Sequence, residues 1–137
     1  MAEAKTKKTT ASVDAFLKTT GDRYADCKTI TKMMEKATGK KAAMWGTAIV
    51  GCDEYPIVYA DGHTEAWPCA AFSPRKEALT IYGTKGSPKF AVLTKKLGKH
   101  KFGGGCLYIK QLADVDAKVL EELIASSVRA KQAKMKK

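Results

Sequence analysis

The stretch EAWPCAAFSPRKEALTIYG, residues 65–83, decides the fold class of this chain. It holds two strand-like runs, EAWPCAAF and ALTIYG, which only the short segment SPRKE separates. Pro74 cannot donate a backbone hydrogen bond to a sheet, so we expect the first strand to end there. Strands that follow each other through short turns pair antiparallel. The stretch therefore predicts two neighbouring strands of an antiparallel sheet.

Three further strand-like runs flank this pair, and they are TAIVG (47–51), PIVYADG (56–62) and CLYIK (106–110). The pair Asp61-Gly62 is a hairpin signal, because glycine accepts the positive φ that such turns require. Pro56 and Pro68 mark strand starts or edge positions, where a missing N–H donor costs nothing. The middle of the chain is thus a series of strands joined by tight turns.

Helical periodicity appears on both sides of these strands. Between residues 24 and 37, apolar side chains recur at steps of three and four, which places them on one helical face. A similar stripe runs from residue 119 to 128. The predicted helix starts are Ser12, Asp22, Ser87-Pro88 and Asp114, and the predicted stops are Gly21, Gly39 and Gly98. Together the elements predict the α+β class, with an antiparallel sheet of about five strands packed against helices.

Length and composition predict one domain. A chain of 137 residues with 45% hydrophobic content suits a single core. We expect the domain to span residues 12–128, with a disordered basic arm (1–11) before it and a basic tail (129–137) that continues the last helix. The start of the sequence lacks the apolar centre of a signal peptide, so we expect a cytoplasmic protein without membrane contact. The four scattered cysteines favour reduced thiols over disulfides or a zinc site.

The net charge of +11 is unevenly distributed. The arm and the tail together carry +7 of it. Within the domain, residues 75–110 hold nine basic residues and one acid, whereas 12–74 and 111–128 are slightly acidic. A concentrated positive field of this kind attracts anions of many classes, from small ligands to nucleic acid.

A triple glycine lies inside this basic block, in the stretch LGKHKFGGGCLYIK (97–110). In a phosphate-binding loop of the Walker type, the glycines follow a strand and precede a Lys-Ser/Thr pair and a helix. Here the order is reversed, so we interpret Gly103–Gly105 as a helix-to-strand turn that requires positive φ. Lys99, His100 and Lys101 follow directly after the predicted helix stop, where they form a basic loop.

A second basic motif, FSPRK (72–76), ends the first strand of the opening stretch. Arg75 and Lys76 lie at a turn or strand end, where an arginine can hold a carboxylate or phosphate through two parallel hydrogen bonds. Ser73 has no nucleophile elbow of the GxSxG type around it, so we do not expect hydrolytic catalysis with His100.

Seven motifs occur in a fixed order along the chain, and they are MWG (44–46), IVG (49–51), WP (67–68), FSPRK (72–76), LGKH (97–100), CLYIK (106–110) and LADVD (112–116). Together they resemble the YdhG-like family, bacterial domains of unknown function, over about residues 11–128. The resemblance implies an antiparallel sheet on helices, similar to the secretion-chaperone-like and TfoX N-terminal-like arrangements. It implies no established enzyme activity, and it adds frataxin-like iron handling as an alternative.

The chain departs from the family pattern at two places. After GKH the family commonly reads KTGKSCLYI, whereas this chain reads KFGGGCLYI, with Gly104 and Gly105 in place of a lysine and a serine. The change removes one cation and one hydroxyl from the basic loop. Frataxin-type iron binding relies on an acidic ridge, whereas the first two predicted helices mix acids with lysines and arginine.

We predict a non-catalytic module that binds a small anionic ligand, without a cofactor. Arg75 is the expected bidentate clamp, Lys99 a point charge, and Trp45 an apolar wall at a helix-to-strand junction. The predicted ligand-binding residues are Trp45, Ser73, Arg75, Lys76, Lys99 and His100.

Three other functions stay open at this point. An iron-binding chaperone would use oxygen and imidazole ligands near the predicted hairpin, namely Asp53, Glu54, His63 and Glu65, or the acids of the first two predicted helices. A nucleic-acid-associated protein would use the basic arm and tail. A module that acts through a protein partner would leave the basic block as a solvated surface.

Overall fold

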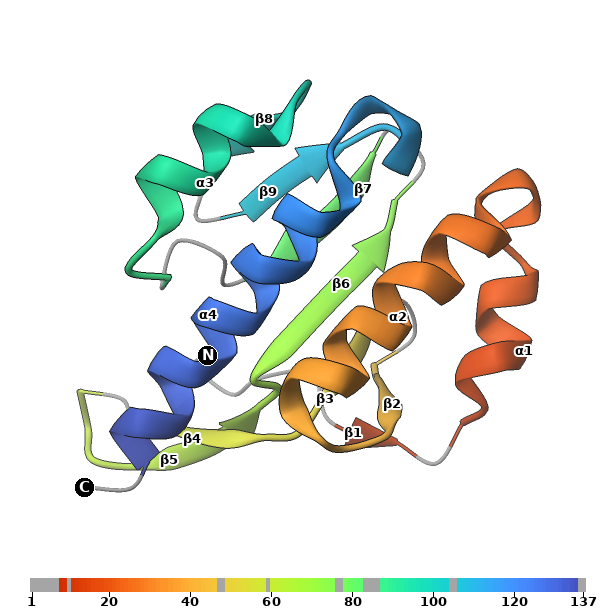
Figure 1. The fold of residues 1–137 in the computed structure, drawn as a ribbon. Helices are drawn as coiled ribbons and strands as arrows, with labels where there is room; N and C mark the ends of the chain where they lie inside the picture. Colours follow the sequence, from red (N-terminus) through yellow and green to blue (C-terminus); the bar gives the residue numbers. More distant parts are fainter. Residues whose placement is uncertain are drawn as a thin grey trace.

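The computed structural model of the chain describes residues 8–9, 11–46, 49–58, 60–75, 78–82, 87–103 and 106–135 (Figure 1). Four α-helices lie in this part of the chain, and they are α1 (Val13–Lys18), α2 (Tyr24–Thr38), α3 (Phe90–Leu97) and α4 (Ala117–Met135). Two short 3₁₀ helices, η1 (Gly21–Arg23) and η3 (Leu112–Asp114), precede α2 and α4. None of the described helices is long and apolar enough to cross a bilayer.

The described strands form an antiparallel sheet of seven strands in the order β1-β2-β3-β6-β7-β9-β8. Its strands are β1 (Lys8–Thr9), β2 (Ala42–Trp45), β3 (Ile49–Cys52), β6 (Ala70–Pro74), β7 (Leu79–Tyr82), β9 (Cys106–Ile109) and β8 (Lys101–Gly103). A separate hairpin joins β4 (Tyr55–Val58) to β5 (Thr64–Trp67). The predicted α+β class with an antiparallel sheet is confirmed. The predicted runs supply β3, β6, β7 and β9 of the main sheet and both strands of the hairpin, whereas β1, β2 and β8 are additional strands.

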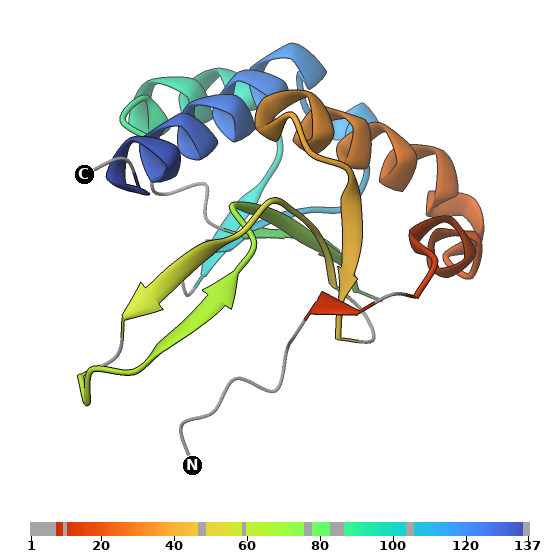
Figure 2. The same ribbon diagram turned by 90° about the horizontal axis from the view of Figure 1, so that it is seen from below.

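Helices α2, α3 and α4 cover one face of the sheet, and the β4–β5 hairpin projects away from its other side (Figure 2). The predicted run EAWPCAAF is not one strand, because it divides at Pro68 into β5 of the hairpin and β6 of the main sheet. The predicted hairpin turn at Asp61-Gly62 is confirmed, with Gly62 at φ 90° and Val58 paired with Thr64.

Alternate side chains of the central strands point towards the helices and form the core. On β7, Leu79 and Ile81 are fully buried on the helix-covered face. Phe72 of β6 and Leu107 of β9 lie in the same apolar cluster. The stripe predicted for the last helix is confirmed as the part of α4 that packs on this cluster, through Leu120, Leu123, Ile124 and Val128.

Capping residues define the start of α1, the end of α2 and the start of α4. The hydroxyl of Ser12 accepts a hydrogen bond from the N–H of Ala15, and Gly39 ends α2 in the left-handed conformation at φ 75°, as predicted. The predicted cap at Asp114 is wrong. A carboxylate oxygen of Asp116 accepts hydrogen bonds from the N–H groups of Lys118 and Val119, so Asp116 caps α4.

The prediction that Gly103–Gly105 form the helix-to-strand turn is wrong for Gly103, which lies in a strand. A strand that the sequence did not predict, β8, follows α3, and Gly103 pairs with Cys106 across the β8–β9 hairpin. Gly104 and Gly105 lie outside the described residues. The helix-to-strand connection is therefore Gly98–His100, and Gly103 is the last residue of β8.

The outer segments are described only in part. Residues 1–7 and 10 of the predicted arm lie outside the described residues, while Lys8–Thr9 form β1 against β2. Helix α4 continues through Met135, so most of the predicted tail is helical.

At Gly98, the backbone conformation and a close backbone neighbour both disfavour any residue with a side chain. Its φ of 112° and ψ of −151° belong to a region that is essentially reserved for glycine. A Cβ atom there would stand 2.6 Å from the carbonyl oxygen of Asp114, which is backbone and cannot rotate away. The replacement Gly98→Ala is expected to lower the free energy of unfolding by roughly 3 kcal/mol, measured by chemical denaturation.

Gly39→Ala provides the matched control for this prediction. Gly39 also has positive φ, but a Cβ atom there would meet nothing within 4 Å. Its cost is expected to be about 1 kcal/mol, from backbone strain alone. Equal losses in the two variants would contradict the role of the close approach to Asp114.

Candidate functional site

A cavity of about 770 Å³ opens at the end of the sheet where β6 and β9 finish and β7 and β8 begin. This volume lies within the range of small-molecule sites. The described residues that line it are Arg75, Ala78, Thr80, Lys99, His100, Lys101, Tyr108, Ile109, Lys110 and Asp114. We call this space the sheet-end cavity.

Strand register brings the floor of the sheet-end cavity together. Thr80 of β7 pairs with Tyr108 of β9, and Tyr108 pairs with Lys101 of β8. Residues directly opposite each other on antiparallel strands share a face. Because Leu79 and Ile81 face the helices, Thr80, Tyr108 and Lys101 occupy the opposite face of the sheet.

Arg75 enters the cavity from the end of β6, and two contacts hold it. The guanidinium of Arg23 in η1 donates a hydrogen bond to the backbone carbonyl of Arg75. The Arg75 side chain in turn donates from Nη2 to the hydroxyl of Tyr82 at 3.1 Å. This hydrogen bond raises the pKa of Arg75 above its ordinary value, so the side chain stays charged at every accessible pH.

The connection between α3 and β8 supplies the opposite rim. Gly98 forms an isolated antiparallel bridge with Val115, and the N–H of Lys99 donates to the carbonyl of Asp114 at 3.1 Å. His100 donates from Nδ1 to the carbonyl oxygen of Gly98 at 2.7 Å. This bond leaves Nε2 as the ring nitrogen with which His100 can contact a ligand.

The described lining residues carry four fixed cations, Arg75, Lys99, Lys101 and Lys110, and one carboxylate, Asp114. Within the described part of the chain, the three lysines take part in no salt bridge. Some cations elsewhere are paired, because Lys89 and Arg129 share Glu122 while Lys18 and Lys28 share Asp14. At the sheet-end cavity, three lysines without a described acidic partner lie around one space together with Arg75.

Thr80 contributes a buried hydroxyl that nothing in the described structure satisfies. The residue is 2% exposed, and its Oγ1 has no hydrogen-bond partner among the described residues. Buried polar groups in folded proteins are normally paired, so an unpaired hydroxyl lining a cavity suggests a ligand group or a water molecule as its partner.

Three of the predicted site residues reach the sheet-end cavity, namely Arg75, Lys99 and His100. Lys76 lies outside the described residues. Ser73 is 3% exposed and does not line the cavity, although its strand leads to Arg75. Ser73 pairs with Thr80 and therefore shares its face of the sheet, but it is buried and is not among the described lining residues.

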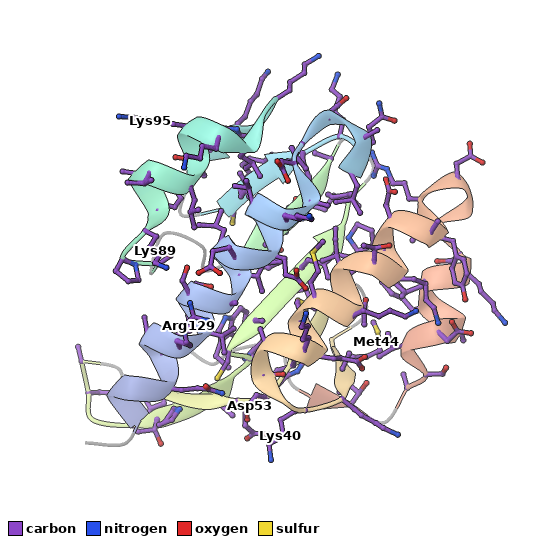
Figure 3. All side chains as sticks on the ribbon, viewed as in Figure 1. Lys40, Met44, Asp53, Lys89, Lys95 and Arg129 are labelled. Carbon is purple, nitrogen blue, oxygen red and sulfur yellow. The ribbon has the colours of Figure 1, made fainter. Side chains whose placement is uncertain are left out.

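Trp45 does not belong to this site. It is 2% exposed, and its ring centroid lies 6.4 Å from that of Trp67. It lines a different cavity of about 210 Å³, together with Lys40 and Asp53. Figure 3 shows Lys40 and Asp53 at the end of the molecule away from Lys95 on α3. The predicted apolar wall is therefore a core contact between β2 and the hairpin.

Thr80, Lys101, Tyr108 and Lys110 line the cavity but were not among the predicted ligand-binding residues. Their signal was present in the alternation of CLYIK, which puts Tyr108 and Lys110 on one face of a strand. What the sequence did not contain was the register between β7 and β9, which adds Thr80 to that face.

The predicted iron ligands receive no support from their arrangement. No group of three or more His, Cys, Asp or Glu residues in the described part of the chain is placed to hold a metal ion. His63 contacts Asp61 within its own turn. The acids of the first helices serve the fold, because Asp26 accepts from the N–H of Leu112 and Glu35 from the N–H of Ala42.

Comparison with known proteins gives no relative, since no family model, no curated protein sequence and no solved structure matches the chain.

The buried hydroxyl of Thr80 leads to a prediction on stability. Thr80→Val keeps the shape of the side chain and removes the unpaired oxygen, so it is expected to raise the free energy of unfolding by about 1 kcal/mol. Thr80→Ser keeps the hydroxyl and loses a buried methyl group, so it is expected to lower the same quantity by about 1 kcal/mol. Denaturant titration of the ligand-free protein measures both, and a destabilised Thr80→Val protein would show that the hydroxyl is already paired.

The four thiols are expected to differ in reactivity. Cys27, Cys52 and Cys69 are buried, and burial raises the pKa of Cys52 to about 12 and that of Cys69 to about 11. Only a small fraction of either is the reactive thiolate at pH 8. A thiol reagent is expected to label partly exposed Cys106 first, and Cys106→Ser is expected to remove the fast phase. A fast phase that survives in Cys106→Ser would disprove the assignment.

Proposed function

We propose that this protein is a non-catalytic module that binds a small anionic ligand in the sheet-end cavity. The observation that carries the proposal is the convergence of Arg75, Lys99, Lys101 and Lys110 on one cavity with a single described carboxylate. Arg75 comes from the end of β6, whereas Lys99, Lys101 and Lys110 come from one later segment that includes β8 and β9.

The charge of the sheet-end cavity favours anions over other ligands. Like charges gathered on one cavity repel each other, and an anion placed between them relieves this repulsion while gaining direct attraction. Arg75 offers a planar fork that matches two oxygens of a phosphate or carboxylate, whereas the lysines act as point charges.

The arrangement favours binding over catalysis. A hydrolytic pair of Ser73 and His100 would need both side chains at one site, but only His100 lines the sheet-end cavity. None of the four cysteines lines it either. The described lining residues offer charges and hydrogen-bond donors, which are the groups that orient a bound anion.

The resemblance to the YdhG-like family is consistent with this proposal. Two of the motifs on which it rests, FSPRK and LGKH, supply Arg75, Lys99 and His100 to the sheet-end cavity. We therefore propose that the chain is a YdhG-like domain and that these motifs form its ligand site. The secretion-chaperone-like or TfoX N-terminal-like arrangement and a cytoplasmic location belong to the same proposal.

The basic tail supports nucleic-acid binding less well. Lys131 donates from Nζ to the carbonyl of Cys69 at 2.9 Å, and Arg129 is paired with Glu122 at 3.0 Å. Two of its cations therefore already have partners within the protein. The cations of the sheet-end cavity are better placed to receive an anion.

A thermal-shift titration with inorganic phosphate and citrate, at constant ionic strength, tests the proposed function. An anion at a hundred times its dissociation constant adds about 2.7 kcal/mol, which raises the midpoint by several degrees. Arg75→Ala and the double variant Lys99→Gln/Lys101→Gln are expected to lose most of this shift.

Lys95→Gln is the matched control, because Lys95 belongs to the same basic block but extends outward from α3 (Figure 3). It is expected to keep the shift of the unmodified protein. If all of these variants show the same shift, the anions bind elsewhere or only through net charge, and the proposed function fails.

A further inference from the structure

The sheet-end cavity is larger than a bare oxyanion needs. Its volume of about 770 Å³ lies in the upper part of the range found for sites that enclose whole organic ligands. The four cations stand exposed at the rim, whereas Thr80 lies buried at the floor. A ligand that fills this space has its negative charge at the rim and an uncharged body beneath it.

Tyr108 gives this body a flat surface. An ideal Cβ atom on Gly103 would lie 3.4 Å from Cε2 of Tyr108, so the tyrosine ring extends over the bare backbone of β8. The hydroxyl of Tyr108 donates a long hydrogen bond of 3.4 Å to the carbonyl of Gly103. The ring therefore lies at van der Waals distance from β8, and Tyr108 is half-buried and lines the cavity.

Thr80 adds a hydrogen-bonding group next to this surface. Thr80 and Tyr108 are directly paired across β7 and β9, and the hydroxyl of Thr80 is unpaired within the described structure. A buried hydroxyl without a hydrogen bond lowers stability, and a ligand that forms a hydrogen bond with Oγ1 of Thr80 removes this penalty. A ring without polar atoms would leave the hydroxyl unpaired.

We propose that the ligand is a phosphorylated molecule with a planar, heteroatom-bearing ring, of the size and chemical class of a mononucleotide. The proposal rests on the proposed function, because it uses the same cavity and the same cations. The phosphate lies between Arg75 and the rim lysines, the ring stacks on Tyr108, and a polar atom of the ligand pairs with Oγ1 of Thr80. Stacking on an aromatic side chain tolerates different bases, so the geometry defines a class of ligand and not one base.

The test uses four probes on the full-length protein: adenosine monophosphate, ribose 5-phosphate, adenosine and inorganic phosphate. Dissociation constants are measured by calorimetry, and amide chemical shifts of ¹⁵N-labelled protein locate the bound probe. Adenosine monophosphate is expected to bind about tenfold more tightly than ribose 5-phosphate, because it alone combines charge with stacking. Its largest shifts are expected at Thr80, Lys101 and Tyr108.

Three variants separate the contributions. Tyr108→Leu is expected to bring adenosine monophosphate to the affinity of ribose 5-phosphate, while Tyr108→Phe keeps the ring and the preference. Thr80→Val is expected to weaken adenosine monophosphate several-fold even though the ligand-free variant is more stable. Because affinity and stability move in opposite directions, partial unfolding cannot account for the loss.

The outcomes separate this inference from the proposed function. If ribose 5-phosphate and adenosine monophosphate bind equally and both depend on Arg75, the ring surface is wrong and anion binding stands. If no probe shifts the cavity amides, both proposals fail. If affinity rises with the length of an oligonucleotide instead of levelling off at one nucleotide, a nucleic-acid strand replaces the mononucleotide as the ligand.

Discussion

Side-chain alternation along β7 and β9 is the constraint on which both the core and the candidate site depend. Leu79, Ile81 and Leu107 face the helices and are fully buried there. Thr80 and Tyr108, which are adjacent in sequence to these residues, therefore lie on the opposite face, where the cavity is. A shift of one residue in the register of β9 would exchange the two sets, so the burial that stabilises the core also fixes the floor of the site.

The rim of the cavity depends on backbone contacts between distant segments. Arg23 in η1 holds the carbonyl of Arg75, and Asp26 in α2 accepts a hydrogen bond from the N–H of Leu112 at 3.1 Å. The N–H of Asp116 donates to the carbonyl of Leu97 at 2.7 Å, which fixes the end of α3 against the start of α4. Exposed lysines on such anchored backbone can converge on a ligand without ordering a whole loop, which lowers the entropic cost of binding.

Two features of the cavity reduce the stability of the ligand-free protein. Four cations without described acidic partners repel one another, and the buried hydroxyl of Thr80 lacks a described partner. Both features lower the stability of the ligand-free protein, and an anionic ligand with hydrogen-bonding groups relieves both. In the surrounding core, apolar side chains are buried as their sequence pattern predicts. At the cavity, by contrast, like charges cluster and a polar group is buried, and such local exceptions are expected at a functional site.

The amino-acid sequence by itself determined the α+β class, the positions of most strands, the caps at Ser12 and Gly39, and the basic character of the segments around Arg75 and Lys99. These features depend on local spacing and on the conformational limits of proline and glycine. Only the tertiary structure decided that β8 joins the sheet edge, that Trp45 is a core residue, and that Thr80 and Tyr108 share a cavity with Arg75. Those facts depend on strand register and on contacts between segments distant in sequence, which a periodic pattern along one segment does not encode.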